Sequence, residues 1–106
     1  MIGLKAPPFP HILTETALAI RKGDAEARAK YLDDQWAQIA NTMTGERLRP
    51  LTVLRAFAIA QSSSVRDAGR VTPYIAALGP SKAEEFAYLA TDWPELQQFI
   101  ATSFAA

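Results

Sequence analysis

The sequence predicts an all-α fold, a compact single-domain bundle of about six helices that spans residues 1–106. Three observations favour this fold. A chain of 106 residues with 49% hydrophobic side chains can bury one core but rarely two. Apolar side chains recur at spacings of three and four, and no segment shows the strict alternation of a half-buried strand. Proline, glycine or capping residues bound most of the helices that these spacings predict.

The N-terminal half predicts a helical hairpin. Residues 1–9 are an extended, proline-rich lead-in, and a helix follows over about 10–22. Gly23 ends this helix, and Asp24 is suited to cap a long helix over 24–43. The apolar side chains of the long helix follow a heptad seam made of Ala25, Ala29, Leu32, Trp36, Ile39 and Met43.

The C-terminal half predicts one buried helix and several short ones. A third helix begins at Pro50 and ends near Gln61, and because it is apolar almost all round it belongs in the centre. Two short helices follow, the first capped by Ser64 and the second over 72–79. Two capping boxes open the last two helices: Ser81 with Glu84 for 81–90, and Asp92 with Glu95 for 92–104.

Charge is unevenly distributed, although 11 basic and 11 acidic side chains give a net charge of zero. Residues 46–82 carry six basic and two acidic side chains, whereas residues 83–106 carry four acidic side chains and no basic one. On the long helix, Glu26 and Lys30 are spaced to form an ion pair. A basic middle and an acidic end can complement each other within one fold or across a symmetric interface.

The composition argues against catalysis, cofactors and metals. The chain has no cysteine, which excludes disulfides, thiolate catalysis and cysteine-based metal sites. His11 is the single histidine, so a catalytic triad or a histidine-rich metal site cannot be assembled. The five glycines form no phosphate-binding loop, and sequence-adjacent carboxylates on a helix point about 100° apart. We therefore expect a protein that is not an enzyme.

The sequence also argues against a membrane protein. No segment approaches the roughly 18 apolar residues that a spanning helix needs. The N-terminus has one lysine and three prolines where a signal peptide would carry an apolar segment. We therefore expect a cytoplasmic protein.

One segment resembles part of a helix-turn-helix. In residues 64–78, Val71-Thr72-Pro73 followed by Ile75 is similar to the turn and the opening of a recognition helix. The resemblance implies a nucleic-acid-binding protein that uses the basic 47–70 region. The residues that would contact nucleic acid are Arg47, Arg49, Arg66, Arg70, Thr72 and Tyr74.

A second segment, residues 19–29, is similar to the helix-Gly-Asp-helix corner in the ligand-sensing domains of GntR-type regulators. Those domains bind a metal through histidines, and this chain offers only His11. We therefore interpret the segment as the corner of an ordinary helical hairpin and carry no function over.

The function that we favour from the sequence is a non-catalytic protein–protein interaction or regulatory module that self-associates. The last predicted helix has no charge from Leu96 to Ala106, and its apolar side chains spread over a wide arc. The candidate interface residues are Trp93, Phe99, Ile100 and Phe104. The alternative is the nucleic-acid-binding protein that the helix-turn-helix resemblance implies.

Overall fold

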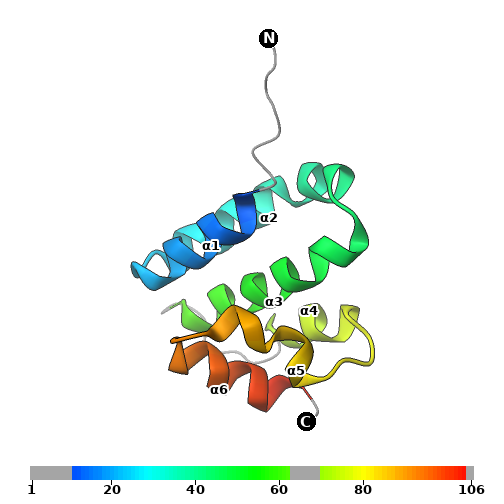
Figure 1. The fold of residues 1–106 in the computed structure, drawn as a ribbon. Coiled ribbons are helices and arrows are strands. Elements are labelled where there is room, and N and C mark those ends of the chain that lie inside the picture. Colours follow the sequence, from blue (N-terminus) through cyan, green and yellow to red (C-terminus); the bar gives the residue numbers. More distant parts are fainter. Residues whose placement is uncertain (1–10, 63–69, 105–106) are drawn as a thin grey trace.

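The computed structural model describes residues 11–62 and 70–104, and within these ranges the chain is helical and contains no strand (Figure 1). The elements are α1 (Ile12–Arg21), α2 (Ala25–Thr42), α3 (Gly45–Gln61), α4 (Thr72–Ala77), α5 (Ala83–Phe86), the 3₁₀-helix η3 (Ala87–Ala90) and α6 (Pro94–Ser103). The predicted all-α fold is confirmed. The short helix predicted after Ser64 lies outside the described residues.

The central element is α3, which lies between the α1–α2 pair and the C-terminal helices (Figure 1). Its side chains from Val53 to Ile59 are all buried, as the sequence predicts for a helix that is apolar almost all round. The one charged residue among them is Arg55.

The predicted start of α3 at Pro50 is wrong, because the helix begins at Gly45 and Pro50 lies inside it. Thr44 caps the helix, and its hydroxyl accepts a hydrogen bond from the backbone N–H of Arg47 at 3.3 Å. Pro50 removes one bond from the helical ladder. The cap and the packing of Leu48 against a buried cluster stabilise the turn that precedes it.

The corner between α1 and α2 is a Schellman motif. The Gly23 N–H donates to the Ile20 carbonyl at 3.0 Å, and the Asp24 N–H donates to the Ala19 carbonyl at 2.9 Å. Gly23 has φ +96°, a backbone conformation that a residue with a side chain adopts only at a cost in free energy. The Asp24 carboxylate makes no capping bond, so its predicted role as a cap is wrong.

Both predicted capping boxes near the C-terminus are wrong, although helices do form there. Ser81 precedes α5 and its hydroxyl donates to the Gly79 carbonyl at 3.0 Å. Asp92 has φ 57°, a left-handed conformation that makes the turn before α6. The segment 81–90 is therefore divided between α5 and η3, and the last helix is shorter than predicted.

Two clusters of buried side chains form the core, and α3 contributes to both. The larger cluster joins α3 to the C-terminal helices and to the α1–α2 corner, and it includes Ile20, Ala25, Val53, Leu54, Phe57, Phe86, Trp93, Leu96, Ile100 and Phe104. The smaller one joins α3 to the hairpin and consists of Ile12, Leu32, Ile39 and Leu51.

Candidate functional site

The predicted interface residues on and beside α6 lie mostly in the core. Trp93 packs edge to face on Phe57, with ring centroids 5.5 Å apart, and Phe104 packs on Phe86 at 5.0 Å. Ile100 is buried, and Phe99 is partly buried against Phe57. The exposed side chains of α6 include Gln97, Gln98, Ala101 and Thr102. The lack of charge on α6 after Glu95 therefore does not leave its large apolar side chains exposed.

Arg49, predicted to contact nucleic acid, is engaged within the fold. Its guanidinium donates to both carboxylate oxygens of Glu85 at 2.7 and 2.9 Å. It also donates to the Leu78 carbonyl and to the Ser81 hydroxyl, each at 2.9 Å. Arg49 thus ties α3 to the loop before α5, and little of its hydrogen-bonding capacity remains for a phosphate.

The other predicted nucleic-acid contacts that the structure describes do not gather on one stripe. Arg47 lies in the first turn of α3, whereas Arg70 lines a pocket beside the last turn, about 20 Å further along the helix. Tyr74 packs its ring on the Arg55 guanidinium, while Thr72 is exposed at the start of α4. Arg66 lies outside the described residues.

We expect the contact between Arg49 and Glu85 to make the free energy of unfolding depend on pH in the acidic range. The hydrogen bond from Arg49 lowers the pKa of Glu85 in the folded protein. The stabilisation is therefore present above the pKa of an unfolded glutamate, about 4.3, and is lost as the pH falls through the lower folded value. Urea unfolding between pH 7 and pH 3 measures this loss, which Arg49→Lys should reduce.

The magnitude of this effect should be small. The two side chains are 29% and 41% exposed, so solvent screens the pair and about 1 kcal/mol is expected. An Arg49→Lys protein with an unchanged pH dependence would show that the ion pair does not stabilise the fold. Lys30→Ala, which removes an exposed pair with Asp34, is the matched control.

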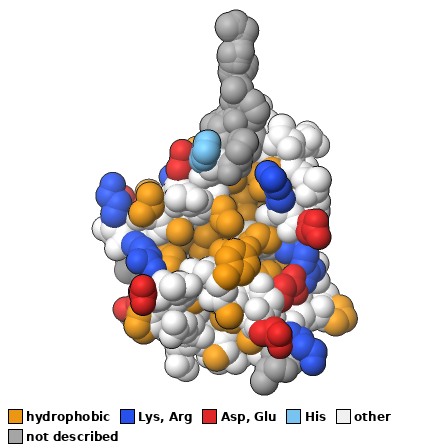
Figure 2. Space-filling view, in the orientation of Figure 1, with side chains coloured by type: hydrophobic (Ala, Val, Ile, Leu, Met, Phe, Trp, Pro, Cys, Tyr) orange, Lys and Arg blue, Asp and Glu red, His pale blue; other side chains and the backbone are white. Residues whose placement is uncertain are grey.

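An apolar groove runs between α1 and η3. Its floor is Leu54 of α3, and its walls carry mostly apolar side chains from the two elements. The hollow has a volume of about 290 Å³, and the residues that line it are Leu13, Thr14, Ala17, Leu18, Arg21, Leu54, Tyr88, Leu89 and Trp93. Figure 2 shows hydrophobic side chains gathered over this part of the surface, with charged side chains of both signs around them.

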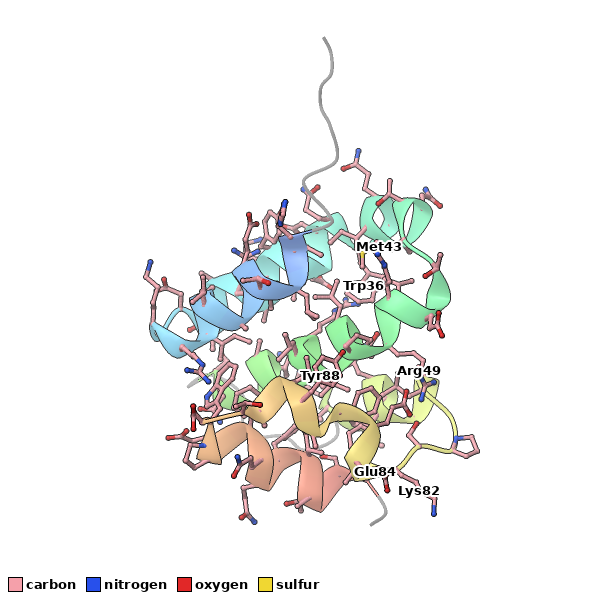
Figure 3. All side chains as sticks on the ribbon, viewed as in Figure 1. Trp36, Met43, Arg49, Lys82, Glu84 and Tyr88 are labelled. Carbon is pink, nitrogen blue, oxygen red and sulfur yellow. The ribbon has the colours of Figure 1, made fainter. Side chains whose placement is uncertain are left out.

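Large apolar side chains remain exposed on the rim of this groove. Leu18 on α1 is 54% exposed and Tyr88 on η3 is 61% exposed. Figure 3 shows Tyr88 in front of α3 on this face. Partial burial raises the pKa of the Tyr88 phenol, and the negative charge of Glu85 raises it further, so the phenol stays neutral at pH 7. At one end, Arg21 stacks on Trp93 at 4.4 Å.

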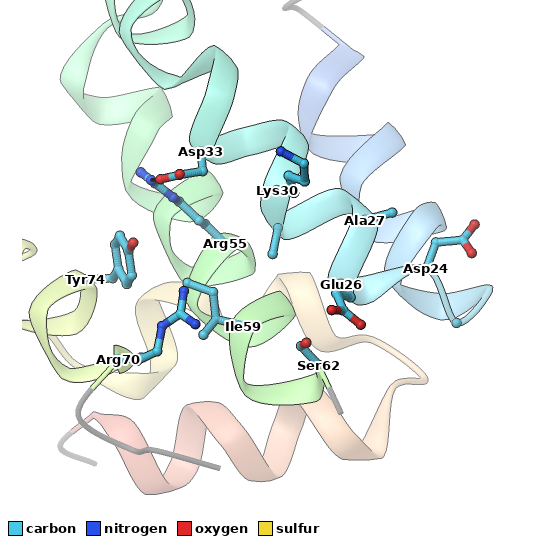
Figure 4. A pocket seen from close by; sticks show the side chains of 12 residues that line it. Asp24, Glu26, Ala27, Lys30, Asp33, Arg55, Ile59, Ser62, Arg70 and Tyr74 are labelled. Atoms are coloured by element: carbon cyan, nitrogen blue, oxygen red, sulfur yellow. Dashed lines mark hydrogen bonds and ion pairs between the residues drawn. The ribbon is translucent and has the colours of Figure 1, made fainter. Parts of the chain in front are cut away.

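A larger pocket, of about 590 Å³, lies between α2, the end of α3 and α4 (Figure 4). Arg55 lies on its wall, with the guanidinium packed between the rings of Trp36, at 4.3 Å, and Tyr74, at 4.6 Å. Arg55 donates to Asp33 Oδ1 at 2.8 Å. Its buried Nε has no acceptor among the described residues.

Three acidic and three basic side chains of the described residues line this pocket, and α2 supplies both signs, since Lys30 and Asp33 lie on the same helix as Glu26. Asp24 and Glu26 come from the start of α2, whereas Arg55 and Arg70 lie on the α3 and α4 side (Figure 4). The predicted pair of Glu26 with Lys30 is absent, because Lys30 instead contacts Asp34 at 3.4 Å. The sequence did not indicate this pocket, since its residues come from segments up to 51 positions apart and follow no motif.

The described residues offer no cluster of three or more histidine, cysteine, aspartate or glutamate side chains that could hold a metal ion. His11 is exposed at the start of α1. No described helix has the length and apolar character needed to cross a bilayer.

Comparison with known proteins gives no relationship from which a function could be transferred. The chain matches no family model, no curated protein and no solved structure. Its class is therefore defined by the fold alone, an all-helical bundle built around one central helix.

Proposed function

We propose that this chain is a non-catalytic interaction module that self-associates through the groove between α1 and η3. The observation that carries the proposal is the pairing of an apolar hollow with large exposed apolar side chains on its own rim, Leu18 and Tyr88. Among the described residues, the large hydrophobic side chains that are exposed are these two and Tyr31. Two of the three thus lie at one hollow, which favours a binding surface over scattered exposure.

The occupant that we propose is a second copy of the chain. In a two-fold symmetric contact, the same surface of each copy faces the other copy, so that surface must be complementary to itself. A hollow that carries protruding apolar side chains beside it meets this requirement, because Leu18 and Tyr88 of one copy can fill the groove of the other.

Charge supports the same occupant. Side chains of both signs surround the apolar surface in Figure 2, and a two-fold contact can bring opposite signs together. The chain also has zero net charge, so copies do not repel each other strongly. We therefore propose the groove between α1 and η3 as the interface in place of the surface of α6 that the sequence indicated, because the apolar side chains of α6 are mostly buried.

Sedimentation equilibrium tests this proposal. We expect a dimer at high micromolar concentration and a dissociation constant at least about tenfold higher for Leu18→Asp, because a carboxylate would be buried at the contact. Tyr31→Asp is the matched control, since Tyr31 is 39% exposed on α2 and does not line the groove.

Circular dichroism must show that both variants keep the helical fold. A wild-type protein that stays monomeric at these concentrations would contradict the proposal. So would a dimer that Leu18→Asp and Tyr31→Asp weaken equally.

A further inference from the structure

We propose that the pocket beside Arg55 binds a small zwitterion, a molecule that carries a carboxylate at one end and an ammonium group at the other. The carboxylate would face Arg55 and Arg70, and the ammonium group would face Asp24 and Glu26. This site is separate from the groove, with which it shares no lining residue.

The first support is the state of Arg55. The side chain is 9% exposed, and the acceptor that the described residues supply to its guanidinium is Asp33 Oδ1. The buried Nε lacks an acceptor in this part of the structure. A methionine could fill the space between Trp36 and Tyr74 without the cost of burying a charge, so packing alone gives little reason for an arginine.

The second support is that three further charges at the pocket form no ion pair within the part of the chain that the structure describes. Arg70 is exposed at the rim and forms no ion pair with any described residue. Asp24 makes no capping bond, and Glu26 makes no pair with Lys30. Asp24 and Glu26, which the sequence assigns to stabilising α2, therefore lie at the same hollow without an ion pair to a described residue.

The third support is the arrangement and size of the pocket. Figure 4 shows Arg70 and Tyr74 on the same side as Arg55, whose guanidinium lies beside the Asp33 carboxylate, and the Glu26 carboxylate across from them. Lys30 and Asp33 also line the pocket, but Lys30 contacts Asp34 and Asp33 accepts from Arg55. The charges left for a ligand are Arg70 on one side and Asp24 and Glu26 at the start of α2, so a molecule with both charges fits best. A volume of about 590 Å³ is within the usual range for small-molecule sites.

Titration followed by proton–nitrogen correlation NMR tests the proposal on the full chain. The probes are γ-aminobutyrate, δ-aminovalerate and ε-aminocaproate, which differ in the separation of their charges. The matched carboxylic acids and the matched amines carry one charge each. The signals observed are the Arg55 Nε–H and the Trp36 indole N–H, because Arg55 lines the pocket and its guanidinium packs on the Trp36 ring.

We expect at least one zwitterion to shift the Arg55 Nε–H signal, with a dissociation constant about tenfold lower than that of its matched acid or amine. Arg70→Ala and Glu26→Gln should each raise this constant severalfold. Both residues are exposed, so neither variant should disturb the fold. Arg47→Ala, in the first turn of α3, is the matched control and should bind as the wild type does.

Three outcomes would overturn the proposal. The first is an Arg55 Nε–H signal that no zwitterion shifts at tens of millimolar. The second is an acid or an amine that binds as tightly as its zwitterion. The third is wild-type binding in either the Arg70 or the Glu26 variant.

Discussion

Phe57→Ala should lower the free energy of unfolding by about 3 to 5 kcal/mol. Phe57 is 1% exposed and lies where α3 meets the C-terminal helices. Its ring contacts Trp93 edge to face at 5.5 Å and Phe99 at 5.3 Å, so alanine would leave a cavity lined by two aromatic rings. Since a small domain is stable by only about 5 to 15 kcal/mol, this is a large fraction of the total.

Urea unfolding followed by circular dichroism measures this change. Gln61→Ala is the control, because Gln61 is an exposed residue of the same helix and should change stability by less than about 0.5 kcal/mol. A Phe57→Ala protein within about 1 kcal/mol of the wild type would show that α3 and the C-terminal helices do not share a core.

Phe104→Glu should destabilise the fold by at least about 3 kcal/mol, because it places a carboxylate among apolar side chains. Phe104 is 8% exposed, and its ring lies 5.0 Å from that of Phe86. Phe104→Leu keeps the site apolar and should cost less than about 2 kcal/mol. Thermal and urea unfolding of the two variants make the comparison.

The same variant bears on self-association. If Phe104→Glu is as stable as Phe104→Leu, the end of α6 is open to solvent and an interface on that helix becomes plausible again. If it is much less stable, a loss of self-association in this variant reports unfolding and not a disrupted contact. Leu18→Asp avoids this ambiguity because Leu18 is 54% exposed.

The helices could be predicted from the sequence because they depend on local spacing and on residues with fixed backbone preferences. The α1–α2 corner at Gly23 and the buried character of α3 are examples. The exact start of α3 could not be predicted, since Thr44 is equally suited to end one helix or to cap the next. The boxes at Ser81 and Asp92 failed because tertiary contacts and a tight turn take those residues.

The candidate sites were much less predictable. The groove depends on which face of α1 meets α3, and the Arg55 pocket depends on how α2, α3 and α4 pack, neither of which spacing determines. Arg49 shows the difficulty: by type and position it resembles a phosphate contact, yet Glu85, 36 residues later, accepts its hydrogen bonds. For α6, the sequence shows that the helix carries apolar side chains, but it does not show whether other helices of the same chain or a partner would bury them.

The sharing of α3 between the two buried clusters restricts how the sequence can change over evolution. A substitution at Leu51 alters the packing of the hairpin, and one at Phe57 alters the packing of the C-terminal helices. Compensating changes for Leu51 must therefore arise on α1 and α2, whereas those for Phe57 can also arise on the C-terminal helices, while α3 itself is retained. By contrast, α4 has no fully buried side chain and meets the core through the partly buried Ile75, with Leu78 just after it, so α4 can diverge with fewer consequences than α3. Homologous chains should accordingly be recognisable by α3 long after α4 has lost its resemblance.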